Sequence, residues 1–266
     1  MPAPERAPPL SGSEAAADGP LPDTGPVTAT LELDEVLRLL REGELSVEGR
    51  LVDASNATLY CVAELGGVSA AVVYKPVRGE RPLWDFPDGT LAGREVAAYL
   101  VSQATGWDVV PPTVLREGPF GTGMCQLWVD VDEGIDLGAL SRSDHPDLRR
   151  MAVLDAVINN ADRKGGHLLP RADGRVQGVD HGICFSTEDK LRTLLWQWRG
   201  TALPDEAVVT LTALREDLRC ALGEALHPLL TVREVRATAA RVDRLLASGC
   251  FPEPSLDWPA IPWPPF

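Results

Sequence analysis

The sequence predicts an α+β protein with two lobes, a small antiparallel β-rich lobe followed by a mostly helical lobe, and a cleft between them. Runs with β character dominate the first half of the 266-residue chain, whereas the second half carries long segments with apolar residues at helical spacing. A short joint near Val129 to Gly134 separates the halves. The chain is long enough for both lobes to have a core, and ligands commonly bind in such a cleft.

The first half is expected to form a sheet with one embedded helix. In the opening helix Leu37 and Leu40 lie on one apolar face, and Gly43 is a plausible end. The Gly66-Gly67 dipeptide between two β-rich runs is typical of a hairpin. The expected elements, in order, are a helix in 31–45, strands in 46–54, 58–65 and 69–76, a helix over 91–106, and strands in 109–117 and 121–133.

The second half is expected to be helical apart from one hairpin. An apolar helix is predicted over 147–161, the hairpin turns at Ala172-Asp173-Gly174, and helical patterns cover 207–226 and 231–249. The last 16 residues contain too many prolines for a helix. We place a disordered Pro/Ala-rich tail at 1–27, the N-lobe at 28–131, the C-lobe at 132–250 and a Pro/Trp-rich tail at 251–266.

Composition narrows the class of protein. The formal net charge is −14 and no basic cluster stands out, which argues against a nucleic-acid partner. No apolar run approaches the roughly 18–20 residues of a transmembrane segment, and the first residues lack the apolar core of a secretory signal. The five cysteines are scattered without a CxxC pair, which is typical of reduced thiols in a cytoplasmic protein. The oligomeric state stays open.

Two carboxylates flank the expected hairpin. Asp162 follows the apolar helix, and Asp180 comes 18 residues later in Val179-Asp180-His181-Gly182. Because a hairpin brings its ends together, both carboxylates are expected to face one point. Phosphoryl transfer uses such a pair, one to orient the acceptor hydroxyl and one to hold the metal that bridges the nucleotide phosphates. The alternative interpretation is a pair of ordinary turns, where Asp and Gly are common.

The first half supplies a complementary cation. Lys75 ends an apolar run, and Glu95 on the following helix is its natural partner; such a pair positions a lysine on the phosphates in kinases. The turn containing Ser55, Asn56 and Thr58 would cap the phosphates with amides and hydroxyls. Taken alone, a lysine at the end of a strand is usually a solvated charge.

These pieces resemble the phosphatidylinositol 3/4-kinase-like branch of the protein-kinase-like superfamily, and also HipA-type and Fam20-type kinases. Within the branch, the chain is similar to a group of actinobacterial proteins. Five motifs occur in family order between about 46 and 190: VYKP at 73–76, REVAAYL at 94–100 running into VPPT at 110–113, QLWV at 126–129, NADR at 160–163 and VDHGICF at 179–185.

The resemblance implies a bilobal kinase-like fold with ATP in the cleft. Lys75 would bind the ATP phosphates and Glu95 would pair with it. Asp162 would be the catalytic aspartate and Asp180 the metal-binding one. The adenine pocket would be lined by the hinge residues Gln126, Leu127, Trp128 and Val129, as part of the segment 126–130.

One position departs from the family pattern. Five residues after the catalytic aspartate the family usually has an asparagine as second metal ligand, and here that residue is His167. Imidazole suits Mn²⁺ better than Mg²⁺. Three interpretations stay open: one metal held mainly by Asp180, a preference for Mn²⁺, or nucleotide binding without efficient transfer.

The sequence therefore predicts an ATP- and Mg²⁺- or Mn²⁺-dependent kinase. Its acceptor would be a hydroxyl on a protein, a small molecule or a lipid headgroup. The alternatives are a nucleotide-binding pseudokinase and a nucleotidyl transferase on the same scaffold. In the loop before the second helix, Trp84 and Phe86 are expected to pin the loop onto the core; the alternative is that its arginine and aromatic residues contact a substrate or the nucleotide. Trp196 and Trp198 are expected to pack in the helical half.

Overall fold

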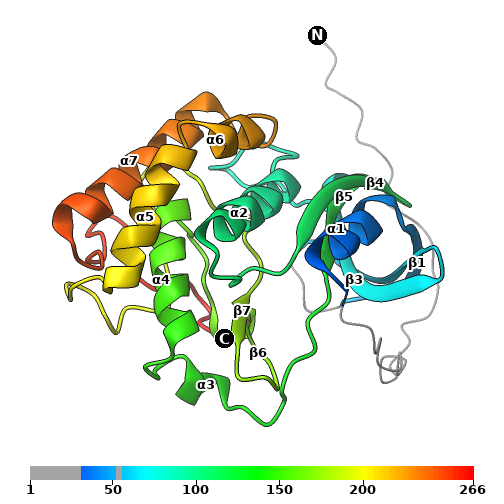
Figure 1. The fold of residues 1–266 in the computed structure, drawn as a ribbon, viewed down its shortest axis with the longest axis horizontal. Coiled ribbons are helices and arrows are strands. Elements are labelled where there is room, and N and C mark those ends of the chain that lie inside the picture. The colour runs from blue at the N-terminus through cyan, green and yellow to red at the C-terminus, as the bar shows by residue number, and fades with distance from the viewer. Residues whose placement is uncertain (1–30, 52–55) are drawn as a thin grey trace.

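The computed structural model describes residues 31–51 and 56–266, so the predicted tail over 1–27 lies outside the described residues. The chain forms an antiparallel five-stranded sheet at one end and a group of helices at the other, with α2 between them (Figure 1). No helix within the described ranges is both long and apolar enough to cross a membrane.

The sheet is built from three hairpin-connected strands and a second hairpin. Its strands are β1 (Glu44–Arg50), β2 (Leu59–Leu65), β3 (Val68–Pro76), β4 (Thr113–Gly118) and β5 (Gly121–Leu127), in the order β1-β2-β3-β5-β4. Gly66 and Gly67 both have positive φ, as the predicted two-residue turn between β2 and β3 requires. The central strand β3 carries Lys75 at its end, with neighbours on both sides.

Two helices accompany the sheet. The helix α1 (Leu33–Glu42) buries Val36, Leu37, Leu39 and Leu40 against it. The helix α2 (Leu91–Thr105) ends at Gly106, whose φ of 68° suits glycine. Because α2 packs on β4 and β5 and also on helices of the other lobe, it is buried on most sides and fixes what it carries relative to both.

The helical lobe contains α3 (Leu137–Leu140), α4 (Pro146–Ile158), α5 (Asp205–Asp217), α6 (Ala221–Leu226) and α7 (Val232–Ser248). The predicted hairpin is present as β6 (Leu168–Pro170) and β7 (Val176–Gly178), and 3₁₀ turns lie at Val77–Gly79 and Gly165–His167. The helical pattern over 207–226 forms two helices instead of one. Cys220 leaves helical geometry, and the redirected α6 buries Leu222 and Leu226 and packs on α2.

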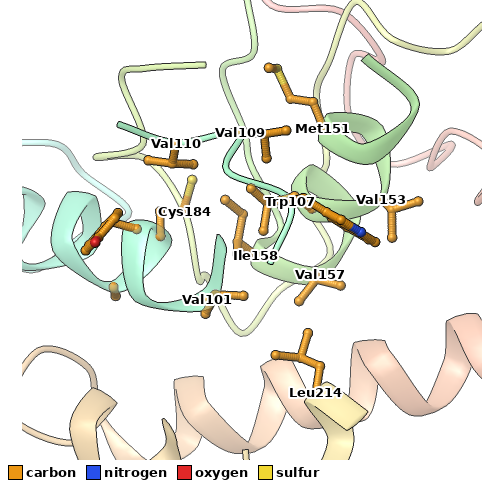
Figure 2. Close-up of a cluster of buried hydrophobic side chains, with 14 of the residues drawn as sticks. Val101, Trp107, Val109, Val110, Met151, Val153, Val157, Ile158, Cys184 and Leu214 are labelled. Atoms are coloured by element: carbon orange, nitrogen blue, oxygen red, sulfur yellow. The ribbon is translucent and has the colours of Figure 1, made fainter. Parts of the chain in front are cut away.

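The core of the helical lobe lies between α2, α4 and α5. Figure 2 shows Val101 of α2, Val157 and Ile158 of α4 and Leu214 of α5 converging, with Trp107 beside them. Trp196 and Trp198 are buried as predicted. The expectation for the loop before α2 is half wrong: Phe86 is buried beneath the Arg94 guanidinium, but Trp84 is 84% exposed.

Candidate functional site

The end of β3 and the middle of α2 bring Lys75 and Glu95 together. Lys75 Nζ lies 2.7 Å from Glu95 Oε1, and the other carboxylate oxygen accepts the His181 backbone N–H at 2.8 Å. Glu95 is almost fully buried, so its charge depends on these two donors. The pair therefore ties the sheet to the segment that follows β7.

Asp180 completes a three-residue cluster. Its Oδ1 lies 2.5 Å from Lys75 Nζ, and its Oδ2 lies 3.3 Å from His167 Nε2. Burial alone would lower the pKa of Lys75, but Asp180 and Glu95 raise it above its ordinary value. In return, Lys75 holds the pKa of Asp180 well below its usual range. The Asp180 backbone has a φ of 64°, which is uncommon for a residue other than glycine, and its half-exposed carboxylate lines the cleft.

Asp162 lies on the loop after α4. Its backbone N–H donates to Asn160 Oδ1 at 2.9 Å, and its carboxylate lies 3.1 Å from Lys164 Nζ. Burial raises the pKa of Asp162, and nearby Asp180 adds to the shift, whereas Lys164 and Arg192 oppose it. A carboxylate with a raised pKa is a better proton acceptor than an ordinary aspartate.

A buried ion pair shapes the loop that carries Asp162. The Arg163 guanidinium donates twice to Asp155 of α4, at 3.1 and 2.9 Å, and once to the Val179 carbonyl at 2.9 Å. Asn160 Nδ2 also donates to Asp155. Both charged side chains are fully buried. Sequence reasoning missed this pair, although an aspartate inside the apolar pattern of α4 was a usable signal.

The cleft contains two adjoining cavities that share Lys75 and Asp180. The larger, of about 240 Å³, is lined mainly by apolar side chains of the sheet, the 127–131 segment and the hairpin, including Val73, Trp128 and Leu169. The smaller, of about 50 Å³, is lined by polar groups, among them Glu95 and Asp162. An apolar slot opening onto a charged corner suits a planar base attached to phosphates.

The predicted hinge residues line the larger cavity, and most of their hydrogen-bonding groups already have a partner in the protein. The Gln126 side chain donates to Thr113 Oγ1, so it faces β4. The N–H groups of Leu127 and Trp128 are bonded to Pro112 and Ala71 carbonyls. Within the described residues Val129 N–H has no backbone partner, which leaves it as the candidate donor to a base.

The predicted phosphate-capping turn is described only in part. Ser55 lies outside the described residues. Asn56 lines the smaller cavity and accepts the Arg81 N–H through its side-chain oxygen, whereas Thr58 lines the larger cavity and is buried. Asn56 and Thr58 thus lie beside the two cavities.

The structure brings Lys75, Glu95, Asp162 and Asp180 to one cavity, and His167 Nε2 lies 3.3 Å from Asp180 Oδ2. Burial lowers the pKa of His167 to about 4, and Arg163 and Lys164 add to this shift, so its ring is neutral near pH 7. Across the described ranges, no group of three or more His, Cys, Asp or Glu side chains is arranged to hold a metal ion.

Comparison with known proteins finds a relative that matches over nearly its whole length. The chain is 44% identical over 268 residues to Protein Rv2133c of Mycobacterium tuberculosis. The match covers 88% of this chain and 96% of that protein. It is 26% identical over 176 residues to phosphatidylinositol 4-kinase gamma 4 of Oryza sativa subsp. japonica, a match to 53% of this chain and only 31% of the plant protein. No family model matches the chain.

Solved structures identify the fold. The crystal structure of the golgi casein kinase superposes with a TM-score of 0.53 at 15% identity, over 81% of this chain and 75% of that one. The likeness to the Helicobacter pylori proinflammatory kinase CtkA is weaker, with a TM-score of 0.46 at 11% identity over 80% of this chain and 94% of that one. The predicted bilobal kinase-like fold is confirmed.

Proposed function

Because the chain belongs to the same family as Protein Rv2133c and has a bilobal kinase-like fold, we propose that it is an ATP- and metal-dependent phosphotransferase. It would move the γ-phosphoryl group of ATP to a hydroxyl acceptor. One observation carries the proposal: Lys75 lies between Glu95 and Asp180, in a cavity that Asp162 also lines.

The proposed nucleotide orientation follows from the two cavities. The base would occupy the apolar slot beside Trp128, with Val129 N–H as donor to its edge, and the phosphates would extend to Lys75. A lysine held by a buried glutamate is a preorganised phosphate ligand, because its ammonium does not have to be ordered when ATP binds. Asn56 and Thr58 flank this path and are the proposed polar groups of the covering turn.

Asp162 is the proposed catalytic residue. It lines the corner occupied by Lys75 and Asp180, and it is held by Asn160 and Lys164. Its raised pKa favours acceptance of a hydrogen bond, and finally a proton, from an acceptor hydroxyl. The neighbouring Lys164 would balance charge at the loop.

The donor set at Asp180 fits a hard divalent cation. Its carboxylate is half exposed, and a Mg²⁺ ion in such sites is usually held by one or two carboxylates together with phosphates and waters. Such an ion would neutralise charge on the phosphates. His167 Nδ1 accepts the Lys164 N–H at 3.4 Å, and its Nε2 is in contact with Asp180 Oδ2 at 3.3 Å. This pattern favours His167 as a residue that orients Asp180, and thus the one-metal interpretation.

The test is phosphate release and transfer from γ-labelled ATP. Wild type should turn over with Mg²⁺, and Asp162→Ala and Asp180→Ala should each lose at least about a hundredfold in rate. Unchanged turnover in either variant would overturn the residue assignment. His167→Asn restores the usual residue type of the family, and a metal preference that survives it supports the one-metal site.

The narrower placement, in the phosphatidylinositol 3/4-kinase-like branch, is part of the proposal. It is supported by the partial match to the plant phosphatidylinositol 4-kinase and by the order of the five motifs. The name of that relative does not fix the acceptor here, because the chain spans about a third of its length.

A second candidate is a nucleotide-binding module without transfer. His167 in place of asparagine is the observation that favours it. A thermal shift by ATP together with no turnover under Mg²⁺ or Mn²⁺ would select it over the kinase.

A further inference from the structure

A third cavity adjoins the smaller cleft cavity at Asp162. It has a volume of about 230 Å³, and Asp162 and Ile183 line both it and the polar corner beside Lys75. Its other walls come from the loop before α2, the segment 190–192 and Trp258. We name it the Arg192 cavity. An acceptor bound there would lie beside Asp162 in a cavity that has no lining residue in common with the proposed base cavity.

Two basic side chains, Lys190 and Arg192, line the Arg192 cavity, and only Lys190 has partners in direct contact among the described residues. Lys190 is 3% exposed, and its Nζ lies 3.0 Å from Asp85 and 3.1 Å from Glu188, and 4.9 and 4.6 Å from the ring centroids of Trp84 and Trp258. Two carboxylates and two aromatic rings therefore satisfy this ammonium, which makes it a structural cation.

Arg192 differs from Lys190 because, among the described residues, it has no carboxylate in direct contact; Asp162 acts on it only from beyond ion-pair distance. Within the described residues its side chain forms no hydrogen bond or ion pair, and its Nε is shielded from solvent without an acceptor. A shielded donor without a partner is rare and costly in proteins. A guanidinium at a cavity wall is the group best suited to bind a carboxylate or phosphate through two parallel hydrogen bonds.

The segment 251–266 contributes Trp258 to the wall of the cavity. Trp258 stacks on Trp84, with centroids 6.4 Å apart and planes at 21°. The Ala260 carbonyl accepts from Thr193 N–H at 3.1 Å and from Trp196 Nε1 at 2.9 Å, and the Pro265 carbonyl accepts from Gly165 N–H at 2.8 Å. The segment is thus fixed on both sides of the Asp162 loop. Because the cavity has a volume of only about 230 Å³ and this segment runs beside it, it suits a small molecule better than a protein loop or a lipid in a bilayer.

We infer that the Arg192 cavity is the acceptor site and that the acceptor is a small hydroxyl-bearing molecule whose carboxylate or phosphate binds Arg192. This inference rests on the proposed function. In the transfer, the acceptor oxygen bonds to the γ-phosphorus and the bond from that phosphorus to the β–γ bridging oxygen breaks. ADP leaves, the hydroxyl proton goes to Asp162, and the product is a phosphate monoester.

The inference is tested by NMR of the arginine Nε–Hε groups in the full chain. The Arg192 signal is assigned by its loss in Arg192→Lys, and exposed Arg199 serves as the matched control. With ADP present to occupy the nucleotide cavity, the probes are inorganic phosphate, acetate and uncharged glycerol. We expect a saturable shift of the Arg192 signal, at least threefold larger than that of Arg199, with phosphate or acetate but not with glycerol.

The two anions separate a phosphate-bearing acceptor from a carboxylate-bearing one. If neither anion moves the Arg192 signal more than that of Arg199, the inference is wrong. The inference is also wrong if the protein phosphorylates a serine-containing peptide while neither anion shifts the Arg192 signal. That result would assign the cavity to a protein acceptor.

The same sample distinguishes this inference from the proposed function. The Trp128 indole signal, assigned through Trp128→Phe, reports the nucleotide cavity because Trp128 lines it. A Trp128 response to ATP with a silent Arg192 removes the acceptor inference alone. A response of Arg192 to anions with no Trp128 response to ATP removes the proposed function, and with it the role of the cavity as an acceptor site.

Discussion

Two ionic clusters lie on either side of the segment 179–181 and differ in how completely their charges are satisfied. The Arg163–Asp155 pair is fully buried and every contact it makes is internal. The Lys75 cluster is closed on the Glu95 side but open at Asp180, whose side chain is half exposed. A saturated cluster holds a loop in place, whereas one with an exposed carboxylate can exchange a partner for a ligand.

Because of this difference, substitutions in the buried pair should mainly reduce the free energy of unfolding, whereas substitutions at Asp180 should mainly reduce activity. Removing one partner of a buried pair leaves an uncompensated charge in the interior, which costs about 3–5 kcal/mol of unfolding free energy. Removing a half-exposed partner leaves a charge that water or the remaining partner can satisfy. The following predictions are ordered by their expected effect on the free energy of unfolding.

The largest loss is expected for Asp155→Ala. This carboxylate accepts from Arg163, Asn160 and Thr193, so its removal leaves the buried guanidinium without its counter-charge and two polar groups without this acceptor. Urea unfolding at pH 7 should show a loss of about 3–5 kcal/mol. Asp189→Ala is the control, because Asp189 pairs with Arg244 at the surface and should lose less than about 1 kcal/mol. Equal losses in the two variants would contradict the comparison.

An intermediate loss of unfolding free energy is expected when the ion pair that joins α2 to α7 is broken. Arg94 Nη2 lies 2.5 Å from Glu234 Oε1, and both side chains are largely buried. Glu234→Gln keeps a residue suited to the capping box with Thr231 but removes the charge. At pH 7 we expect a loss of about 1.5–3 kcal/mol in urea unfolding.

The loss at Glu234 should depend on pH. Burial would raise the pKa of Glu234, but the Thr231 N–H and Arg94 lower it below its ordinary 4.5. A lowered pKa in the folded state means that the stabilisation is fully present above about pH 4.5 and disappears as the pH falls through the folded value. The difference between wild type and Glu234→Gln should therefore be constant from pH 7 to 5 and shrink below that. A difference that grows on acidification would have the wrong sign.

A small effect on stability, together with a large effect on turnover, is expected for Asp180→Asn. Lys75 keeps Glu95 as a partner, so unfolding should change by less than about 1 kcal/mol. The amide is a poor ligand for a divalent cation, so turnover of ATP should fall at least about a hundredfold. A variant that unfolds like Asp155→Ala would place Asp180 among the structural charges instead.

The elements that local patterns specify were predicted well. The Gly66-Gly67 turn needs positive φ at both positions, and β2 and β3 flank it in register as expected. The alternation of β-rich and helical segments fixed the two lobes. Lys75 and Glu95 were predicted as a pair because strand and helix follow one another closely, and the two side chains are in contact. Their functional roles, with those of Asp162 and Asp180, stay predictions.

Contacts between distant segments were not predictable in this way. Arg94 meets Glu234 across 140 residues, and Trp84 meets Trp258 with no periodic pattern linking them. The break between α5 and α6 depends on where Leu222 and Leu226 find a packing surface, which is a tertiary property. The Asp155–Arg163 pair is close in sequence, but its burial becomes apparent only when Val179 and His181 lie over it.

The smallest effect on unfolding is expected where 251–266 meets the Asp162 loop. A Cβ added to Gly165 would lie 1.9 Å from Cε1 of the Phe266 ring, whereas a Cβ on Gly166 would meet nothing within 4 Å. Phe266 is more than half exposed, so Gly165→Ala should displace the ring and cost no more than a few tenths of a kcal/mol in unfolding. Limited proteolysis should cut 251–266 faster in Gly165→Ala than in wild type or in the matched control Gly166→Ala. Equal cleavage rates in the three proteins would mean that the contact at Gly165 does not hold the segment, which would leave the wall of the Arg192 cavity dependent on Ala260 and Trp258 alone.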